Sequence, residues 1–396
     1  MRFIDQLDIA GKKLLMRVDF NVPLDGETIT DDNRIKAAVP TFKYALEKGA
    51  SVIVMAHLGK PKGKRVDSLS LAPAAKRLGE YLGMEVPLAP DCIGSEVEKM
   101  AAELKPGQVM MLENLRFHAE EQAKTPEERG DFGKQLAALA DIYVNDAFGV
   151  AHRANASVVD VPYAAKDCCA GFLLKLEWEY LGEALKNARK PYIAVSGGAK
   201  VSSKLGILNN LIGKVDDFII GGAMANTFLL AQGKAVGKSL VEESLVDTAK
   251  EIMDKAAGSG TTLHLPTDFV WGKDIDTAQG VCDGDSVPED GMLLDIGPES
   301  AKKFCEVIER SKTIVWNGPM GLFEKEPFAQ GSLKVCEAMA DLEDATTIVG
   351  GGDTDAVVHQ AKLEDKFTFI STGGGSFLEF LEGKELPAFK ALKENS

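Results

Sequence analysis

The chain has 396 residues, enough for two or three domains, and its 45% hydrophobic and 27% charged residues are typical of a folded protein with a substantial core. Its 60 acidic and 45 basic residues give a net charge of −15, which argues against a protein that binds nucleic acid or an anionic membrane. A local basic cluster could still bind a small anion, because salt screens the field of the whole protein beyond roughly 8 Å.

Short apolar runs that end in polar residues alternate with longer amphipathic stretches in the first half of the chain. They predict strands over residues 14–18, 52–55, 109–112 and 142–144. Strands of this nearly continuous apolar kind belong to parallel sheets that helices cover on both faces. Ligands of such sheets bind at the carboxyl ends of the strands, so the residues that follow each strand are candidates for a functional site.

Polar and basic side chains follow these strands. The candidates are Asp19 and Asn21 after the first strand, then Arg34, His57 after the second strand, Arg116 after the third, and His152 with Arg153 after the fourth. A single histidine or arginine is more often a packing or surface residue. Several along one sheet edge instead describe a pocket for a small polyanion, because arginine suits bidentate contacts with carboxylates and phosphates.

A helical pattern over residues 172–188 separates the two halves, and Pro191 ends it. Nine of the ten arginines precede residue 190, whereas the glycine doublets and triplets cluster after it. We therefore predict an α/β protein with two doubly wound parallel-sheet (Rossmann-like) domains that differ in ligand chemistry and are joined by a hinge helix.

The second half repeats the strand pattern with glycine at the strand ends. Strands are predicted over residues 192–195, 218–220, 314–316, 347–349 and 368–370. The first is followed by GGAKVSSK at 197–204, where we expect a helix to begin. Lys200 and Lys204 would share one face near its N-terminus, which is unfavourable for two cations unless a bound anion offsets it. The segment therefore predicts a phosphate site.

Two further glycine-rich segments follow later strands. Residues 350–354 (GGGDT) contain more glycine than a helix cap by Asp353 requires. A carboxylate beside a phosphate-binding loop suits Mg²⁺, so Asp353 is the predicted metal ligand. Residues 371–375 (STGGG) would present backbone N–H groups to a transferring phosphoryl group. We expect a capping box between Ser376 and Glu379.

Three weaker segments lie in the same half. Residues 317–324 could be only a turn and the pair at 221–222 only a packing contact, but with the other glycine-rich strand ends they indicate a mononucleotide site. Residues 233–239 (GKAVGKS) resemble a Walker A loop but are one residue short and follow a helical stretch, so we exclude them.

Export and membrane insertion are not predicted. The first eight residues include charges where a signal peptide is apolar, and no run approaches the ~20 apolar residues of a membrane span. The six cysteines include no C-x-x-C pair, which indicates reduced thiols. We expect a cytoplasmic protein.

Eight segments occur in an order that resembles the phosphoglycerate kinase family, over essentially the whole chain. They are RVDFNVP at 17–23, HLGKP at 57–61, NLRF at 114–117, AHR at 151–153, GGAKV at 197–201, WNGPMG at 316–321, GGGDT at 350–354 and STGGG at 371–375. Two positions depart from the family pattern: Lys60 stands where arginine is usual, and Asn155 where many members have histidine.

The resemblance implies reversible phosphoryl transfer from 1,3-bisphosphoglycerate to Mg-ADP, which yields 3-phosphoglycerate and ATP in glycolysis. No general base is needed, because the carboxylate that attacks ATP in the reverse direction is already ionised at pH 7. The domains must close on their two substrates before transfer. We expect a monomer with Mg²⁺ as cofactor and these small molecules as partners, without nucleic acid or membrane.

Matching positions carry the implied roles. The substrate site would comprise Asp19, Phe20, Asn21, Arg34, His57, Leu58, Gly59, Lys60, Arg116 and Arg153. The nucleotide site would comprise Gly198, Lys204, Gly222, Asn317, Pro319, Glu324 at the ribose, Gly351, Gly352, Asp353 toward Mg²⁺, and Thr354. The catalytic residues would be Arg34, Lys200, Gly352 and Gly374.

The implied division of the chain has four parts. A 3-phosphoglycerate-binding domain would span 1–171, the hinge helix 172–188, a nucleotide-binding domain 189–376, and a segment that returns to the first domain 377–396. Two other functions stay open. An NAD-type two-domain oxidoreductase would need a G-x-G-x-x-G turn, which is not evident. A non-enzymatic hinged anion-binding protein would leave Lys200, Lys204 and Asp353 without a joint purpose.

Overall fold

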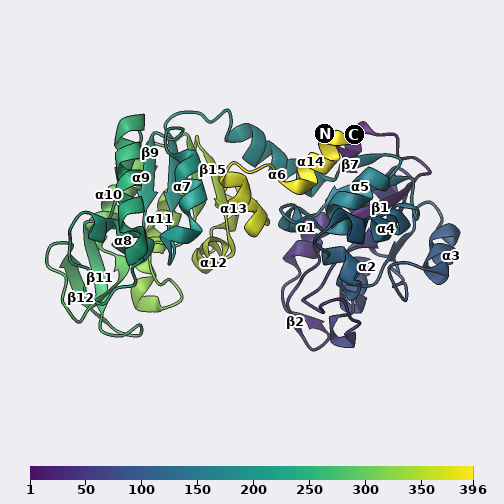
Figure 1. Cartoon of the computed structure of the whole chain (residues 1–396), viewed down its shortest axis with the longest axis horizontal. Coiled ribbons are helices and arrows are strands. Elements are labelled where there is room, and N and C mark those ends of the chain that lie inside the picture. The colour runs from purple at the N-terminus through teal and green to yellow at the C-terminus, as the bar shows by residue number, and fades with distance from the viewer. Residues whose placement is uncertain (396) are drawn as a thin grey trace. The chain divides into compact units, whose positions relative to one another are not determined.

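The computed structural model describes residues 1–395, with side chains at all of these positions except 183 and 184. The chain forms two compact units: unit 1 comprises Met1–Glu179 and Glu385–Ser396, and unit 2 comprises Tyr180–Lys384 (Figure 1). Each unit contains its own parallel sheet. The predicted α/β class with two doubly wound parallel-sheet domains is therefore confirmed.

The sheet of unit 1 has five parallel strands in the order β5-β4-β1-β6-β7. They are β1 (Lys13–Val18), β4 (Ser51–Met55), β5 (Val109–Met111), β6 (Ile142–Asp146) and β7 (Cys168–Ala170). The first four lie where the apolar runs predicted them. β7 was not predicted, because its three residues include no β-branched or aromatic side chain.

Helices cover this sheet, and its core is continuous with them. They are α1 (Asn33–Glu47), α2 (Ala72–Leu82), α3 (Ser95–Glu103), α4 (Pro126–Ala137), α5 (Val161–Ala164) and α6 (Phe172–Glu177), and a short hairpin, β2 (Leu24–Asp25) with β3 (Thr28–Ile29), precedes α1. Ile35 and Phe42 of α1 and Leu78 of α2 pack in one cluster with Leu14 and Val52 of the sheet. Apolar burial on the sheet thus holds the strand ends of unit 1 in place.

The predicted hinge helix over 172–188 is shorter in the structure. α6 continues into a π-helical segment, Trp178–Ala184, and the helical conformation ends there. Asp146 caps the start of α6, since its Oδ1 accepts from the N–H groups of Leu173 and Leu174 at 2.9 and 3.2 Å. The division between the units falls within the π-helical segment, between Glu179 and Tyr180.

The C-terminal helix α14 (Pro387–Glu394) belongs to unit 1, where Figure 1 shows it beside α6. The ring of Phe389 lies 6.0 Å from that of Phe148 and 5.1 Å from that of Trp178. The preceding helix α13 (Gly375–Leu381) stays in unit 2 because it packs on α7. The segment that joins unit 1 therefore begins at Glu385, later than the predicted residue 377.

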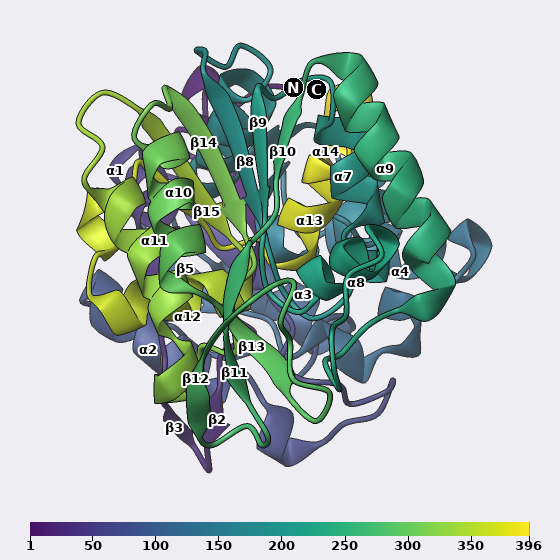
Figure 2. The ribbon, with the colours of Figure 1, turned by 90° about the vertical axis from the view of Figure 1, so that its left-hand side faces the viewer.

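The sheet of unit 2 has six parallel strands in the order β10-β9-β8-β14-β15-β16. They are β8 (Tyr192–Ser196), β9 (Asp217–Ile220), β10 (Thr262–His264), β14 (Thr313–Asn317), β15 (Thr346–Gly350) and β16 (Phe369–Ser371), of which only β10 was not predicted. Figure 2 shows helices on both of its sides. On one side lie α10 (Pro298–Ile308), α11 (Gln330–Ala340) and α12 (Gly352–Ala361), and on the other α7 (Leu205–Leu211), α8 (Met224–Ala231) and α9 (Val246–Ser259).

Unit 2 also contains a three-stranded antiparallel sheet that the sequence did not predict. Its strands, in the order β12-β11-β13, are β11 (Asp268–Gly272), β12 (Ala278–Asp283) and β13 (Met292–Ile296). Most residues of β12 are exposed, so the strand lacks the apolar run by which the other strands were recognised.

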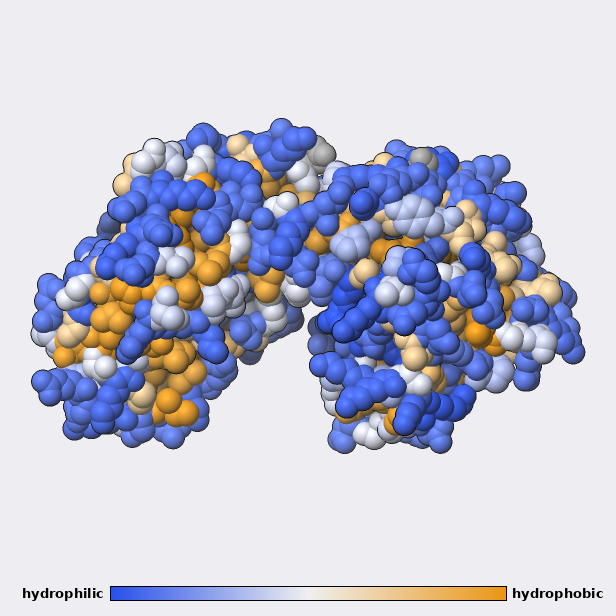
Figure 3. Space-filling model, in the orientation of Figure 1, coloured by the Kyte–Doolittle hydropathy of each residue, from blue (hydrophilic) through white to orange (hydrophobic). Residues whose placement is uncertain are grey.

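The hydrophilic surface and the unpaired cysteines agree with what the composition predicts. Figure 3 shows hydrophilic residues over much of the visible face of both units, with hydrophobic residues gathered mainly on unit 2. Within residues 1–395, no helix combines the length and the apolar character that a bilayer crossing requires. All six cysteines are free thiols, as the sequence predicted.

Candidate functional site

Loops of unit 1 converge at the carboxyl ends of β1, β4 and β5, where a polyanion pocket was predicted. Arg34, near the start of α1, donates from Nη1 to Asp19 Oδ2 at 2.9 Å. Asn21 Oδ1 accepts from the Gly59 N–H at 2.8 Å, and Arg116 Nη1 donates to the Gly59 carbonyl at 2.7 Å. The structure thus brings these five predicted residues to one edge of the sheet.

Behind this edge lies a buried polar chain that the prediction of site residues missed. Arg17 of β1 is fully buried, donates from Nε to Ser157 Oγ at 2.9 Å, and has Nη2 3.1 Å from His57 Nδ1. Ser157 Oγ in turn donates to Glu121 at 2.7 Å, and Asn155 Nδ2 donates to the same carboxylate at 3.2 Å. A charged residue inside an apolar strand was the signal that could have revealed Arg17.

The electrostatics of this edge are strongly positive. Burial lowers the pKa of His57 well below its ordinary value, and the charges of Arg17, Arg116, Arg34 and Arg153 lower this pKa further. His57 is therefore neutral at pH 7, and because Arg17 can only donate, His57 Nδ1 accepts and its Nε2 carries the proton. Burial and Arg153 lower the pKa of Arg116 to about 10, so Arg116 stays cationic at neutral pH.

The remaining predicted residues of unit 1 fall into two groups. Lys60 and Arg153 are exposed, so their charges are available to a ligand from solvent. Phe20 and Leu58 are buried, and the Leu58 N–H donates to Asn114 Oδ1 at 3.2 Å. Their side chains belong to the core, which leaves only their backbone groups for ligand contact.

In unit 2, loops after β8, β9, β14 and β15 meet at a glycine-rich edge. The Gly198 N–H donates to the Pro319 carbonyl at 3.0 Å, and the side-chain amide of Asn317 donates to the Gly350 carbonyl at 2.6 Å. Glycine is required for this approach: a Cβ on Gly222 would lie 2.5 Å from the backbone nitrogen of Gly198. The loops therefore leave a surface of backbone groups with few side chains.

Lys204 is the buried cation of this edge. Its Nζ donates to Asn317 Oδ1, and the residue is only 9% exposed. Burial lowers the pKa of Lys204, while the negative charges of Asp353 and Glu382 act in the opposite direction. Lys204 and Asp353 thus lie close enough to interact, although they are far apart in the sequence.

The expected helix face with Lys200 and Lys204 is wrong. Val201–Ser203 forms a 3₁₀ turn, and α7 begins only after Lys204. Lys200 is exposed and has an extended backbone. The Glu242 carboxylate accepts from the backbone N–H and the hydroxyl of Ser202, inside this turn, at 2.9 and 2.6 Å. A side chain of the protein therefore occupies the Ser202 N–H, one of the backbone groups in the segment predicted to bind phosphate.

The helix caps near the glycine triplets also differ from expectation. The N-cap of α12 is Gly351, with φ of +99°, and Asp353 lies exposed in the first turn. The N-cap of α13 is Gly374, with φ of +50°. The expected capping box of Ser376 and Glu379 is wrong, because Ser376 already lies inside this helix.

The other predicted residues of unit 2 lie along the same loops. The buried Thr354 hydroxyl accepts from the Gly318 N–H at 2.7 Å and so ties α12 to the loop after β14. Glu324 is exposed in that loop. A Cβ added to Gly352 or Gly374 would meet nothing within 4 Å, so both helix starts face open space.

The residues present fit Mg²⁺ only if a bound ligand supplies further oxygens beside Asp353. Among the described residues, Asp353 joins no cluster of three metal-ligating side chains, so an ion there would need oxygens from a ligand, which is typical of Mg²⁺ with phosphates. One such cluster exists in unit 1, formed by Asp91, Cys92 and His118. Burial raises the pKa of the Cys92 thiol well above its ordinary value, and the thiol donates to the Glu113 carbonyl, which disfavours a metal-binding thiolate.

Known proteins resemble the chain over its whole length. A family model described as phosphoglycerate kinase matches residues 4–384. A phosphoglycerate kinase of Maridesulfovibrio salexigens is 98% identical over 396 residues, which is 100% of both chains. One of Chloroherpeton thalassium is 52% identical over 393 residues, 98% of each chain.

Two solved structures share the fold. That of phosphoglycerate kinase from Coxiella burnetii has a TM-score of 0.92 at 42% identity and covers 99% of this chain and 98% of its own. That of phosphoglycerate kinase from Pyrococcus horikoshii has a TM-score of 0.85 at 34% identity and covers 100% of both chains. Likeness in sequence and in fold therefore point to the same family.

Proposed function

The chain belongs to the phosphoglycerate kinase family and is a phosphotransferase of glycolysis, and from this premise we propose how its residues bind the substrates and transfer the phosphoryl group. The reaction exchanges a phosphoryl group between 1,3-bisphosphoglycerate and ADP and yields 3-phosphoglycerate and ATP. The relatives support neither an NAD-type oxidoreductase nor a hinged binding protein.

The basic edge of unit 1 binds 3-phosphoglycerate in this proposal. The observation that carries it is the group of four arginines around the neutral His57, in a chain whose net charge is −15. Arginine forks match the carboxylate and the phosphate of this substrate. The Nε2–H of His57 supplies a further donor without a further charge. Asp19 and Asn21 hold Arg34 and Gly59 in position and remain available for the substrate hydroxyl.

The glycine-rich edge of unit 2 binds the nucleotide. Backbone groups around Gly198, Gly222 and Gly351 allow a close approach of the phosphates, and Lys204 supplies a buried positive charge. Asp353 would hold Mg²⁺ together with phosphate oxygens, and the ion would neutralise charge on the transferring group. Glu324 is proposed for the ribose hydroxyls because it is an exposed acceptor on the loop after β14.

Transfer itself needs charge neutralisation and in-line alignment. We assign these tasks to Arg34 and Lys200 and to the backbone N–H groups of Gly352 and Gly374 at the starts of α12 and α13. Because reacting atoms must come within roughly 3–3.5 Å, a closing motion of the two units belongs to the proposal. Exclusion of water at closure would protect the acyl phosphate from hydrolysis.

A trapping assay tests this function. Purified protein is mixed with 3-phosphoglycerate and Mg-ATP, and the acyl phosphate is detected by coupled reduction. We expect turnover that disappears when EDTA removes Mg²⁺, and a loss of kcat by several powers of ten in Lys200→Ala with unchanged thermal stability. Absence of turnover in the folded protein would contradict the reaction, whereas full activity of Lys200→Ala would contradict only its role.

We further propose a cytoplasmic monomer. The free thiols support a reducing compartment, in which cysteines stay unpaired. Light scattering after gel filtration measures the mass in solution, and a mass near 42.5 kDa is expected for one chain.

A further inference from the structure

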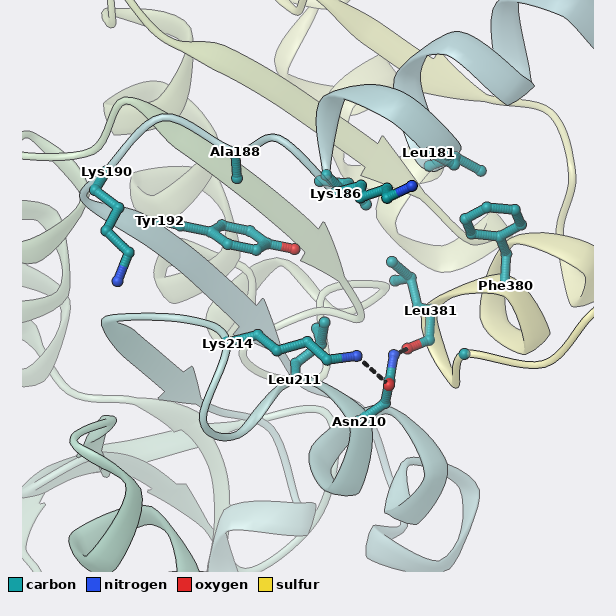
Figure 4. A pocket seen from close by; sticks show the side chains of 13 residues that line it. Leu181, Lys186, Ala188, Lys190, Tyr192, Asn210, Leu211, Lys214, Phe380 and Leu381 are labelled. Atoms are coloured by element: carbon teal, nitrogen blue, oxygen red, sulfur yellow. Dashed lines mark hydrogen bonds between the residues drawn. The ribbon is translucent and has the colours of Figure 1, made fainter.

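A cavity of about 460 Å³ lies in unit 2 away from the glycine-rich edge (Figure 4). It is bounded by the π-helical segment, the start of β8, the end of α7 and the end of α13. Tyr192, which lines it, is the first residue of β8, so the cavity lies at the amino end of this strand. The proposed nucleotide site uses the carboxyl ends, and none of its residues lines the cavity. The volume is typical of sites for small organic molecules.

One side of the cavity is apolar and carries a single polar atom without a partner. Leu181, Leu211, Phe380 and Leu381 line it. Tyr192 is 4% exposed, and its buried hydroxyl has no hydrogen-bond partner. Figure 4 shows this hydroxyl pointing between Lys186 and Leu211 toward the interior of the cavity. Since an unpaired buried hydroxyl is unfavourable and phenylalanine would pack equally well, the hydroxyl indicates an acceptor on a ligand.

The polar side of the cavity is positive. Lys186 and Lys214 lie on either side of the Tyr192 hydroxyl in Figure 4, and Lys214 Nζ donates to Asn210 Oδ1 at 2.5 Å. Asn210 is itself held by a bond from Nδ2 to the Leu381 carbonyl at 2.8 Å. None of the described lining residues is acidic, although the chain as a whole is. Lys190 differs, because its ammonium pairs with Asp216 at 2.8 Å and points away from the cavity.

We propose that this cavity binds a small amphipathic anion: an aromatic or branched apolar body with one carboxylate or sulfonate group. The apolar body packs against the leucines and Phe380, the anionic group lies between Lys186 and Lys214, and an acceptor atom receives the Tyr192 hydroxyl. Such a ligand also contacts the two segments of unit 2 that connect it along the chain to unit 1. Leu181 lies just after the first boundary between the units, and Gly383 lies just before the second.

Fluorescence titration of the full-length protein tests the site. The probe is 8-anilinonaphthalene-1-sulfonate, and its uncharged analogue N-phenyl-1-naphthylamine serves as the comparison, with Mg-ATP present throughout to occupy the nucleotide site. We expect saturable binding of one sulfonate per chain. The Lys186→Ala/Lys214→Ala variant should bind the sulfonate about tenfold more weakly or worse, and the uncharged analogue with unchanged affinity.

Matched variants separate this site from general apolar binding. Lys190→Ala removes a lysine of the same wall whose charge is already paired, and it should leave both affinities unchanged. Tyr192→Phe should bind the sulfonate several-fold more weakly, and its thermal stability should be equal to that of the wild type or higher, because the unpaired buried hydroxyl is removed. Bound sulfonate should slow amide exchange in residues 181–188 and 380–383. The proposal is overturned if binding is not saturable, or if the double variant and Lys190→Ala bind the sulfonate equally well.

A filling variant provides the last check. Ala188→Phe adds a ring to the cavity wall and should abolish binding of both probes. Wild-type affinity in folded Ala188→Phe protein contradicts the site. Because the two lysines are exposed, the double variant is expected to fold and keeps the test decisive even if Ala188→Phe does not fold.

Discussion

Buried ionic groups stand directly behind the basic edge of unit 1, and each is satisfied by a specific partner. The Glu121 carboxylate, fully buried, accepts from the backbone N–H and hydroxyl of Ser157 at 2.9 and 2.7 Å and from Asn155. Ser157 also accepts from Arg17, so one hydroxyl connects the buried cation with the buried anion. Removing any one donor leaves a buried charge with fewer hydrogen bonds in the interior, where a charge is most costly.

Asn155 provides a test of this chain of contacts. In Asn155→Ala, Glu121 loses one donor, and we expect the free energy of unfolding of unit 1 to fall by about 1–3 kcal/mol. Asn155→His, which offers a ring N–H at the same position, should restore most of the loss. Urea unfolding measures both variants. Equal stability of Asn155→Ala and the wild type would show that the contact at 3.2 Å contributes nothing.

Lys204 allows the nucleotide site to be tested through a single ammonium group. Lys204→Met keeps the length of the side chain, and we expect KM for Mg-ATP to rise about tenfold or more while KM for 3-phosphoglycerate changes little. Because burial lowers the pKa of Lys204 and thus disfavours its charge, the variant should be as stable as the wild type or more stable. The control is Lys303→Met, an exposed lysine of α10. A rise in KM for both substrates would contradict the assignment.

Helix starts and strand ends in unit 2 depend on backbone conformations that few residues allow. Gly351 has φ of +99°, and a Cβ there would lie 2.4 Å from Asn317 Nδ2. Asp295 of β13 holds the start of α11, since its carboxylate accepts from the N–H of Gly331 at 2.7 Å, and it also accepts from the N–H of Ile296 in its own strand at 2.9 Å. The starts of α12 and α11 therefore each depend on a single residue, Gly351 and Asp295.

Gly351→Ala tests the first of these. We expect unit 2 to lose about 1–3 kcal/mol of stability, because the backbone is strained and the Asn317 amide must move. Mg-ATP affinity should fall with it. Gly258→Ala, in α9 with no atom within 4 Å of the added Cβ, is the matched control and should be neutral or slightly stabilising. Thermal unfolding and a Mg-ATP titration measure the pair.

Asp295 makes the stability of unit 2 depend on pH. Burial raises its pKa from 3.8 to about 7, so between these values the folded state binds the proton more tightly than the unfolded state. The group therefore stabilises the fold at low pH, and this contribution is lost as pH rises toward 7, by roughly 4 kcal/mol at most. Asp295→Asn should flatten this dependence and be more stable than the wild type at pH 8. Urea unfolding from pH 5 to 8 measures the free energy of unfolding of both proteins. If this free energy depended on pH in the same way in Asp295→Asn and in the wild type, the assigned role of Asp295 would be contradicted.

At the scale of the whole chain, each unit has its own core, and unit 1 is completed by the last helix. Ala388, Phe389 and Leu392 of α14 are buried, although unit 1 is otherwise built from residues before 180. The Ala388 N–H donates to the Ala151 carbonyl at 3.1 Å, two residues before Arg153. The C-terminus thus supports the proposed phosphoglycerate site although it contributes no residue to it.

Phe389→Ala should lower the stability of unit 1 alone and so separate the unfolding transitions of the two units. We expect unit 1 to lose about 3–5 kcal/mol, because a buried ring is removed, while unit 2 is unchanged. Calorimetry should then show unit 1 unfolding first, with 3-phosphoglycerate raising only its transition and Mg-ATP only that of unit 2. If Mg-ATP stabilised unit 1 instead, the proposed division of the substrates would be wrong.

The sequence alone was sufficient for most of the parallel strands and for the family. Residues of a strand that is covered on both faces must be apolar along their whole length, so β1, β4, β8 and β14 are visible as runs. Each run ends in a polar or glycine-rich segment, at the strand end where ligands of parallel sheets are expected to bind. Short strands such as β7, and the exposed β12, lack this property and were missed.

Only the tertiary structure decided which side chains meet. The carboxylate of Glu242 accepts from the N–H of Ser202 in the 3₁₀ turn after Lys200, and the negative charge of Asp353 acts on Lys204. Neither interaction has a signal in local spacing, because the partners come from different strands and helices. The unpaired Tyr192 hydroxyl is of the same kind: a tyrosine at a strand start is unremarkable in sequence, and it becomes informative only when the packing around it leaves its oxygen without a donor or acceptor.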